Sequence, residues 1–109
     1  MKNCVILRRS ECVILPLVLK AKWYYLIDAG CKKQEYRQFC EYWRVRLENW
    51  KAKKGAHVVE FRLGYGHNAP RTAWTLTHVE LDDEVWHPDW GEPAGWHYVI
   101  GLGKRVLWR

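Results

Sequence analysis

The sequence predicts a single α+β domain that is mainly β, with five or six strands and two or more short helices. Its 109 residues, 49% of them apolar, are enough for one domain with a substantial core but too few for two. Most apolar segments alternate with polar residues or run unbroken for eight residues at most, as strands do. Helical spacing occurs in only two stretches, both before residue 55.

Strands are expected at the start of the chain. The segment Cys4–Leu7 recurs as Cys12–Leu15, which predicts two short strands on either side of Arg8–Glu11. The second of these continues as a buried strand over Val13–Leu19. Pro16 lies inside this strand and has no N–H to donate, so the strand should lie at a sheet edge or carry a bulge.

Two helices follow. Ala21–Ala29 is predicted as a short helix because Trp23 and Ile27 fall on one face, and Gly30 can supply the C-terminal cap. Phe39–Trp50 is predicted as a longer amphipathic helix, with basic residues around an apolar stripe.

The second half of the chain alternates between strands and turn-rich loops. Alternating apolar residues over His57–Leu63 predict a half-buried strand. Gly103 is expected to turn the chain into a last short strand, Lys104–Trp108. The other predicted elements are, in order, a glycine-containing loop over Gly64–Pro70, a strand over Thr72–Leu81, an acidic loop over Asp82–Gly95 and a strand over Trp96–Leu102.

Charge and aromatic content allow a nucleic-acid partner. The net charge is +6, but residues 1–54 hold 13 basic and 5 acidic side chains, and residues 55–109 hold 5 and 7. A basic half attracts polyanions because phosphate contacts release counterions, although a solvated basic face without a partner explains the pattern equally well. Most of the eight tryptophans and six tyrosines are expected in the core, but aromatic faces also stack on bases.

The cysteines and histidines form no local metal-binding motif. The four cysteines lie within the first 40 residues without a C-x-x-C pair, and the five histidines are nine to eleven residues apart. We therefore expect free, buried thiols, no metal, no cofactor and a reducing, cytoplasmic compartment. The longest apolar run has eight residues, too few to span a bilayer, so no membrane partner is expected.

The densest polar cluster, Gly30–Arg37, is the main candidate site. It lies between the two predicted helices as a turn that runs into an extended segment. There Glu35 and Arg37 point to the same side, and Lys32, expected to be exposed, can reach Glu35 across the turn. Such a Lys–Glu–Arg cluster can form a structural ion pair, or it can bind a phosphate or the edge of a base.

The pattern Gly30-x-Lys32-x-x-Glu35-x-Arg37 resembles the G-x-K-x-x-E-x-R signature of the ASCH domain family. Further segments are similar to small phage and bacterial members, in order along the chain. They are Leu17–Gly30, Glu35-Tyr36-Arg37 followed by Tyr42-Trp43, Gly64–Pro70, Trp90–Pro93 and Leu102–Lys104. The resemblance covers about residues 13–108, so we expect a domain over residues 12–109 after an N-terminal extension of residues 1–11.

The resemblance implies a PUA-like small β-barrel with a cleft between the signature and the loop that faces it. It also implies RNA binding, and some members hydrolyse N4-acylated cytidines or cleave RNA. In the amidohydrolase branch the signature lysine acts with a hydroxyl residue three positions on and with a distant glutamate. Lys32 matches that lysine, but Glu35 stands at the hydroxyl position and removes the expected nucleophile. Glu80 and Glu84 are the candidates for the distant glutamate.

The first functional hypothesis is an RNA- or nucleotide-binding protein. The second is a hydrolase for a modified nucleoside, or a ribonuclease, and the third is a protein-interaction module such as a phage accessory factor. In an enzyme, Lys32 and Glu35 would be catalytic, and His67 would be the acid–base group of a ribonuclease. The expected ligand-binding residues are Trp23, Lys32, Arg37, Tyr65, His67, Asn68 and Arg71.

The predicted cleft has a basic side and an aromatic side. Its far wall is expected to be Tyr65–Arg71, with Tyr65 stacking on a base and Asn68 reading the base edge. Five cations are expected on one continuous positive surface, namely Lys20, Lys22, Lys32, Arg37 and Arg71. Two of them begin a predicted helix, where either a bound anion or ordinary solvation would accommodate them.

Overall fold

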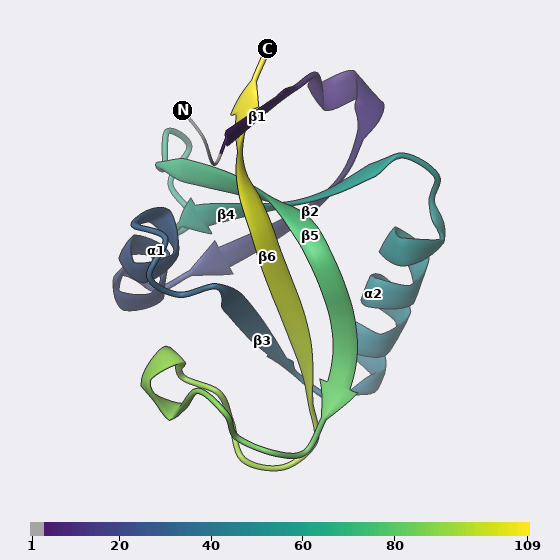
Figure 1. The fold of residues 1–109 in the computed structure, drawn as a ribbon, viewed down its shortest axis with the longest axis vertical. Helices are drawn as coiled ribbons and strands as arrows, with labels where there is room; N and C mark the ends of the chain where they lie inside the picture. Colours follow the sequence, from purple (N-terminus) through teal and green to yellow (C-terminus); the bar gives the residue numbers. More distant parts are fainter. Residues whose placement is uncertain (1–3) are drawn as a thin grey trace.

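A computed structural model describes residues 4–109 and shows an α+β domain that is mainly β (Figure 1). Six strands and two α-helices confirm the predicted class. In chain order the elements are β1 (Cys4–Leu7), η1 (Arg9–Glu11), β2 (Cys12–Leu19), α1 (Ala21–Asp28), β3 (Gln34–Gln38), α2 (Glu41–Ala52), β4 (Ala56–Leu63), β5 (Arg71–Asp82), η2 (Pro88–Trp90) and β6 (His97–Trp108). Within this range, neither helix is long and apolar enough to cross a bilayer.

The six strands form one mixed sheet in which β6 has three partners. The strand order is β1-β6-β5-β4-β2, and β3 pairs with β6 outside this path. β1 and β3 lie end to end along one edge of β6, while the long strand β5 occupies the other edge. The pairs β1·β6 and β2·β4 are parallel and the others are antiparallel. The two strands predicted around Arg8–Glu11 are therefore confirmed.

The sheet is open, so the predicted barrel is wrong. Within the described chain, β2 pairs only with β4 and β3 only with β6, so β2 and β3 do not pair with each other. Side chains occupy this edge of β2: Arg46 Nη2 donates to the carbonyl oxygen of Pro16 at 2.7 Å, and Arg37 Nη2 to that of Val18 at 3.4 Å. Among the described strands β2 has a partner on one side only, which confirms the edge position predicted from the missing N–H of Pro16.

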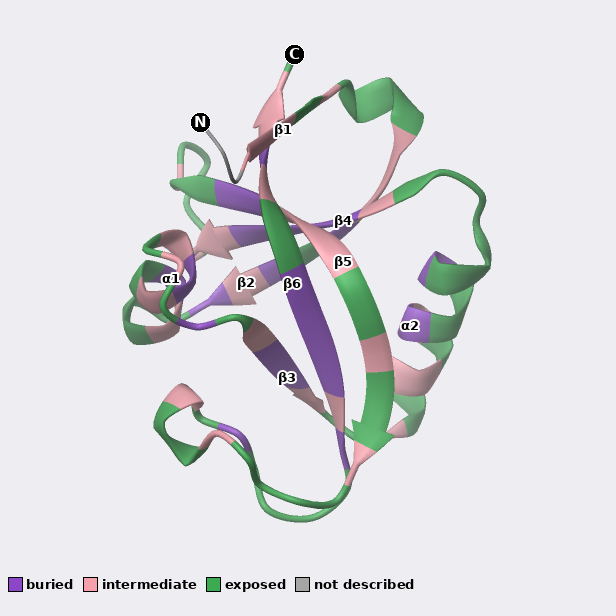
Figure 2. Ribbon diagram, in the orientation of Figure 1, coloured by how far each residue is buried: buried purple, intermediate pink, exposed green. Residues whose placement is uncertain are grey.

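The main core lies between the sheet and the two helices (Figure 2). α1 contributes Tyr24 and Ile27, and α2 contributes Leu47 and Trp50, while Tyr42 on α2 is exposed. β4 was predicted to be half-buried, but four consecutive residues, Val58–Phe61, are buried. The reason is its place between β5 and β2, where a second small cluster covers its other face. The cysteines are free as predicted but are half-buried or exposed, not buried.

β6 runs unbroken from His97 to Trp108, so the turn predicted at Gly103 is wrong. Glycine is required there for close approach of two strands, because a Cβ on Gly103 would lie 2.5 Å from Oγ1 of Thr75. That same Oγ1 accepts a hydrogen bond of 2.8 Å from the amide of Lys104. β5 shifts register at this level, where bulges bring it against β6.

Replacing Gly103 by alanine is expected to destabilise the domain by about 1–3 kcal/mol, because the added methyl overpacks the β5–β6 contact. Urea denaturation measures the free energy of unfolding. Gly66→Ala is the matched control, since a Cβ at Gly66 meets no atom within 4 Å. Equal stability of the two variants would show that β5 and β6 do not approach as closely as described.

Candidate functional site

A cleft of about 600 Å³ opens where the sheet fails to close. The ends of β2 and β4, the start of α1, the segment through β3 and two residues of the β5–β6 loop all border it. The lining residues are Val18, Leu19, Lys20, Ala21, Trp23, Lys32, Glu35, Tyr36, Arg37, Leu63, Gly64, Tyr65, Gly91 and Pro93. A volume of this size is typical of small-molecule sites, which span roughly 300–1,000 Å³.

The turn after α1 places Lys32 inside this cleft. Gly30 has a φ of +79°, a conformation that favours glycine, and the amides of Cys31 and Lys32 both donate to the carbonyl oxygen of Leu26. The chain therefore reverses directly after the helix and enters β3. Lys32 was expected to be exposed, but it is only 2% exposed.

Glu35 joins two cations at the centre of the cleft. Its Oε1 lies 3.0 Å from Nζ of Lys32, and its Oε2 lies 3.0 Å from Nη2 of Arg37. Glu35 and Arg37 are two residues apart on β3, so they share a side as predicted. Glu35 is 5% exposed, which makes this a buried, charge-assisted triad.

Aromatic rings surround the two cations. Nζ of Lys32 lies 4.4 Å from the ring centroid of Trp23 and 5.4 Å from that of Tyr36. The guanidinium of Arg37 lies 5.0 Å from the ring of Trp43, a contact not predicted from the sequence. Burial lowers the pKa of Lys32, although the attraction of Glu35 opposes this shift. Together these effects leave the pKa of Lys32 below its ordinary value.

Arg37 keeps hydrogen-bonding capacity for a ligand. Its Nη2 carries both of its hydrogen bonds to described residues, to Glu35 and to Val18. Its Nε is buried without a partner among these residues. Since Arg37 lines the cleft and is half-buried, its Nη1 can still meet an anionic group.

Four of the predicted ligand-binding residues line the cleft: Trp23, Lys32, Arg37 and Tyr65. His67 and Asn68 do not, and both are exposed. The loop after β4 folds back on itself instead, because Arg62 Nη2 donates to the carbonyl oxygen of Gly66 at 2.8 Å and Ala69 N donates to the same oxygen at 3.1 Å. Of the predicted far wall, Tyr65–Arg71, only Tyr65 lines the cleft, together with the preceding residue, Gly64.

The predicted basic surface is also only partly formed. Lys20, Lys32 and Arg37 line the cleft, whereas Lys22 lies over the ring of Trp23 without lining it. Arg71 borders a separate cavity of about 340 Å³ that also contains Arg9, Glu60 and Trp108.

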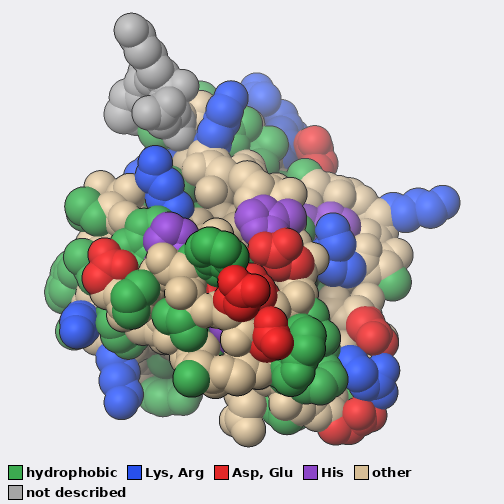
Figure 3. Space-filling model, turned by 60° about the horizontal axis from the view of Figure 1, so that its bottom comes forward, with side chains coloured by type: hydrophobic (Ala, Val, Ile, Leu, Met, Phe, Trp, Pro, Cys, Tyr) green, Lys and Arg blue, Asp and Glu red, His purple; other side chains and the backbone are tan. Residues whose placement is uncertain are grey.

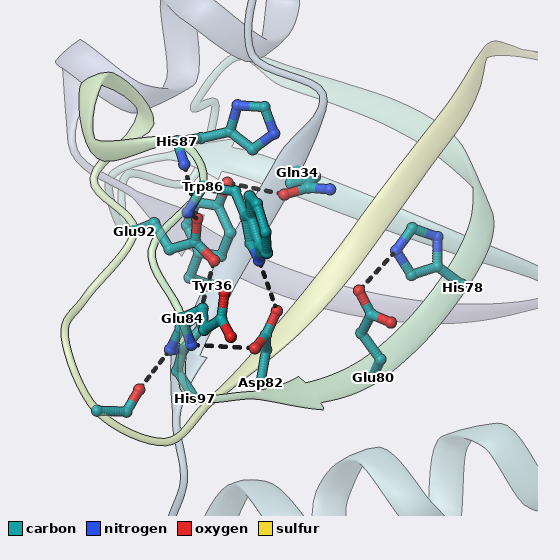
Figure 4. A network of polar contacts seen from close by, with 11 residues as sticks. Gln34, Tyr36, His78, Glu80, Asp82, Glu84, Trp86, His87, Glu92 and His97 are labelled. Carbon is teal, nitrogen blue, oxygen red and sulfur yellow. Dashed lines mark hydrogen bonds and ion pairs between the residues drawn. The ribbon is translucent and has the colours of Figure 1, made fainter.

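The β5–β6 loop supplies a wall that sequence reasoning missed. Gly91 and Pro93 line the cleft, and the residue between them, Glu92, is buried against His97 (Figure 4). Glu80 and Glu84, the candidates for a distant catalytic glutamate, are both exposed and do not line the cleft. Nothing in the acidic loop distinguished Glu92 from its neighbours, because its burial depends on a partner beyond the loop.

The cleft combines three cations, one carboxylate and three aromatic rings. Lys20, Lys32 and Arg37 outnumber Glu35, so the lining favours an anionic ligand. Tyr65 is 86% exposed at the rim and offers a free ring face. Among the described residues, no group of three His, Cys, Asp or Glu side chains could hold a metal ion.

Comparisons with protein-family models, with curated proteins and with solved structures gave no match for this chain. The resemblance to the ASCH family therefore stays a prediction.

Proposed function

We propose that the cleft binds a nucleotide or a short stretch of single-stranded RNA. The observation that carries this proposal is the buried Lys32–Glu35–Arg37 triad inside a cleft with excess positive charge. A phosphate would meet Arg37 and Lys20 beside the start of α1, where the helix dipole favours an anion. A base would stack on Tyr65 at the rim.

The charge distribution over the surface supports a one-sided approach of RNA. The face that carries the β5–β6 connection gathers acidic side chains at its centre (Figure 3). Residues 72–103 contain no Lys or Arg, and Glu80, Asp83 and Glu84 among them are exposed. Because these carboxylates repel phosphates, a longer RNA would extend from the cleft toward α1 and not across this face.

The same geometry supports the ASCH resemblance as part of this proposal. Three signature residues, Lys32, Glu35 and Arg37, meet in one cleft, and the fourth, Gly30, has the positive φ that favours glycine.

A second candidate function is hydrolysis of an acylated nucleoside, and the lowered pKa of Lys32 favours it. Neutral Lys32 would take a proton from water as the water oxygen attacks the acyl carbon. The C–N bond then breaks, and the proton passes to the leaving amino group. The ribonuclease alternative has less support, since His67 lies outside the cleft lining.

The test of nucleotide binding compares two neighbouring lysines. Lys20→Ala is expected to weaken binding of cytidine 5′-monophosphate about tenfold, a loss of about 1.4 kcal/mol, because Lys20 lines the cleft. Lys22→Ala removes the same charge from the same helix end outside the lining and should change affinity little. Isothermal titration measures both.

Salt provides the second measurement for this proposal. Affinity for a labelled ten-nucleotide single-stranded RNA should fall steeply as salt rises, because bound phosphates release counterions. An affinity for both probes that is independent of salt and equal in the two variants would contradict the proposed phosphate contacts.

A further inference from the structure

The β5–β6 loop closes one side of the cleft by contact with Trp23. Gly91 has a φ of +81°, and a Cβ on it would lie only 2.6 Å from Cζ2 of Trp23. The loop backbone therefore packs directly on the ring that also faces Nζ of Lys32. If the loop moved away, the cleft would lose the wall formed by Gly91 and Pro93.

One carboxylate fastens this loop from inside. Oε1 of Glu92 accepts hydrogen bonds from the amides of Trp86 at 2.7 Å and His87 at 2.8 Å. Its Oε2 lies 2.7 Å from Nε2 of His97, the first residue of β6. The side chains of Glu92 and His97 are 1% and 0% exposed, so water does not compete for these bonds.

The partners of His97 make the pair ionic. Its Nδ1 lies 2.6 Å from the carbonyl oxygen of Gly95, which can only accept, and its Nε2 faces the carboxylate of Glu92. Both ring nitrogens therefore donate, which requires the imidazolium. Burial alone would lower the pKa of His97, but its bonds to Gly95 and Glu92 raise it. Burial likewise opposes ionisation of Glu92, yet the bonds from His97, His87 and Trp86 lower its pKa.

We propose that the Glu92–His97 ion pair is a latch that holds Gly91 and Pro93 against Trp23, so that the cleft binds its nucleotide only while the pair is formed. This inference rests on the proposed nucleotide-binding function. If His97 loses its proton, Nε2 becomes an acceptor that faces the carboxylate, and the attraction becomes repulsion. Three other titratable groups of the described residues interact with the pair: Tyr36 on β3, Asp82 on β5 and His87 in the loop. Glu35 and Asp89 act in turn on Tyr36.

The pH range over which the latch is closed follows from the shifted pKa values of His97 and Glu92. The pKa of His97 is raised above its ordinary 6.5, so its contribution is complete below that pH and is lost as pH rises through the raised value. The pKa of Glu92 is lowered below its ordinary 4.5, so its contribution is lost only as pH falls through the lowered value. On the alkaline side, deprotonation of His97 opens the latch.

The experiment compares Glu92→Gln with the control Glu80→Gln. Oε1 of Glu80 also lies near a histidine, 3.6 Å from Nε2 of His78, but both of these side chains are exposed. Hydrogen exchange at the amides of Trp86 and His87 reports the latch, and titration with cytidine 5′-monophosphate reports the cleft. We expect Glu92→Gln to speed exchange and weaken binding, each about tenfold, and Glu80→Gln to change neither. Unchanged exchange, or faster exchange with unchanged affinity, overturns the latch.

A pH titration of the unsubstituted protein keeps the test independent of whether Glu92→Gln folds. The amide signals of Trp86 and His87 and the indole signal of Trp23 should shift together in one alkaline transition. A transition of the Trp86 and His87 amides that leaves the Trp23 indole signal unmoved overturns the latch. If the unsubstituted protein binds neither the nucleotide nor the RNA, the proposed function fails, while the coupled signals of Trp23 and the loop still decide the latch.

Discussion

Replacing Glu35 by glutamine is expected to destabilise the domain by about 3–5 kcal/mol. Glu35 is the common partner of Lys32 and Arg37, and Lys32 is 2% exposed. Glutamine keeps the shape but removes the charge, which leaves two cations side by side in a site of low dielectric constant. For a domain of this size the melting temperature should fall by at least about 12 °C.

The control for Glu35→Gln is Glu48→Gln. Glu48 lies 2.9 Å from Arg44, but both side chains are substantially exposed, so its loss should change stability little. Urea denaturation at several pH values adds a second check. Without Glu35 the pKa of Lys32 should fall further, so the destabilisation should shrink as alkaline pH discharges Lys32. Equal effects of the two substitutions would contradict a buried, charged triad.

The elements that the sequence predicted correctly are those defined by local periodicity. α1 and α2 follow from apolar residues at helical spacing, and β2 from an unbroken apolar run. The signature cluster was also predictable, because Lys32, Glu35 and Arg37 are close in sequence and a single turn brings them together.

The errors arose where a residue type has two structural uses. Glycine permits turns, but at Gly103 it permits two strands to touch. Closure of the sheet could not be predicted from periodicity, since it depends on whether β2 pairs with a strand or with arginine side chains.

The parts of the site that the sequence did not predict depend on side-chain contacts that periodicity does not encode, even between residues four or five positions apart. His67 and Asn68 were expected in the cleft because their loop has binding-type residues, but Arg62 draws that loop back on itself. Glu92 looked like one more surface carboxylate in an acidic run. Only its position relative to His97 in the folded chain makes it a buried ion-pair partner.

The second large effect is expected from Lys32→Met, this time on ligand binding and turnover. Methionine can fill the space between Trp23 and Tyr36, and Glu35 keeps its bond to Arg37. Oε1 of Glu35 loses its partner, however, so stability should fall by about 1–3 kcal/mol. Affinity for cytidine 5′-monophosphate should fall about 10- to 100-fold, because Lys32 supplies one of the three cations that line the cleft and an interaction with a charged group contributes about 1.5–3 kcal/mol.

Two further variants, Lys33→Met and Lys32→Arg, show whether Lys32 binds the ligand, acts as a base or does both. Lys33→Met is the control, because Lys33 is exposed and borders a different cavity, so binding should persist. If the protein hydrolyses N4-acetylcytidine, Lys32→Met should lower turnover about 10²- to 10⁴-fold, the usual contribution of a general base. Lys32→Arg keeps a permanent charge that cannot act as a base, so it should retain binding yet lose hydrolysis. Unchanged binding and turnover in Lys32→Met would contradict a role of Lys32 in either proposed function. Lys32 would then only support the turn after α1.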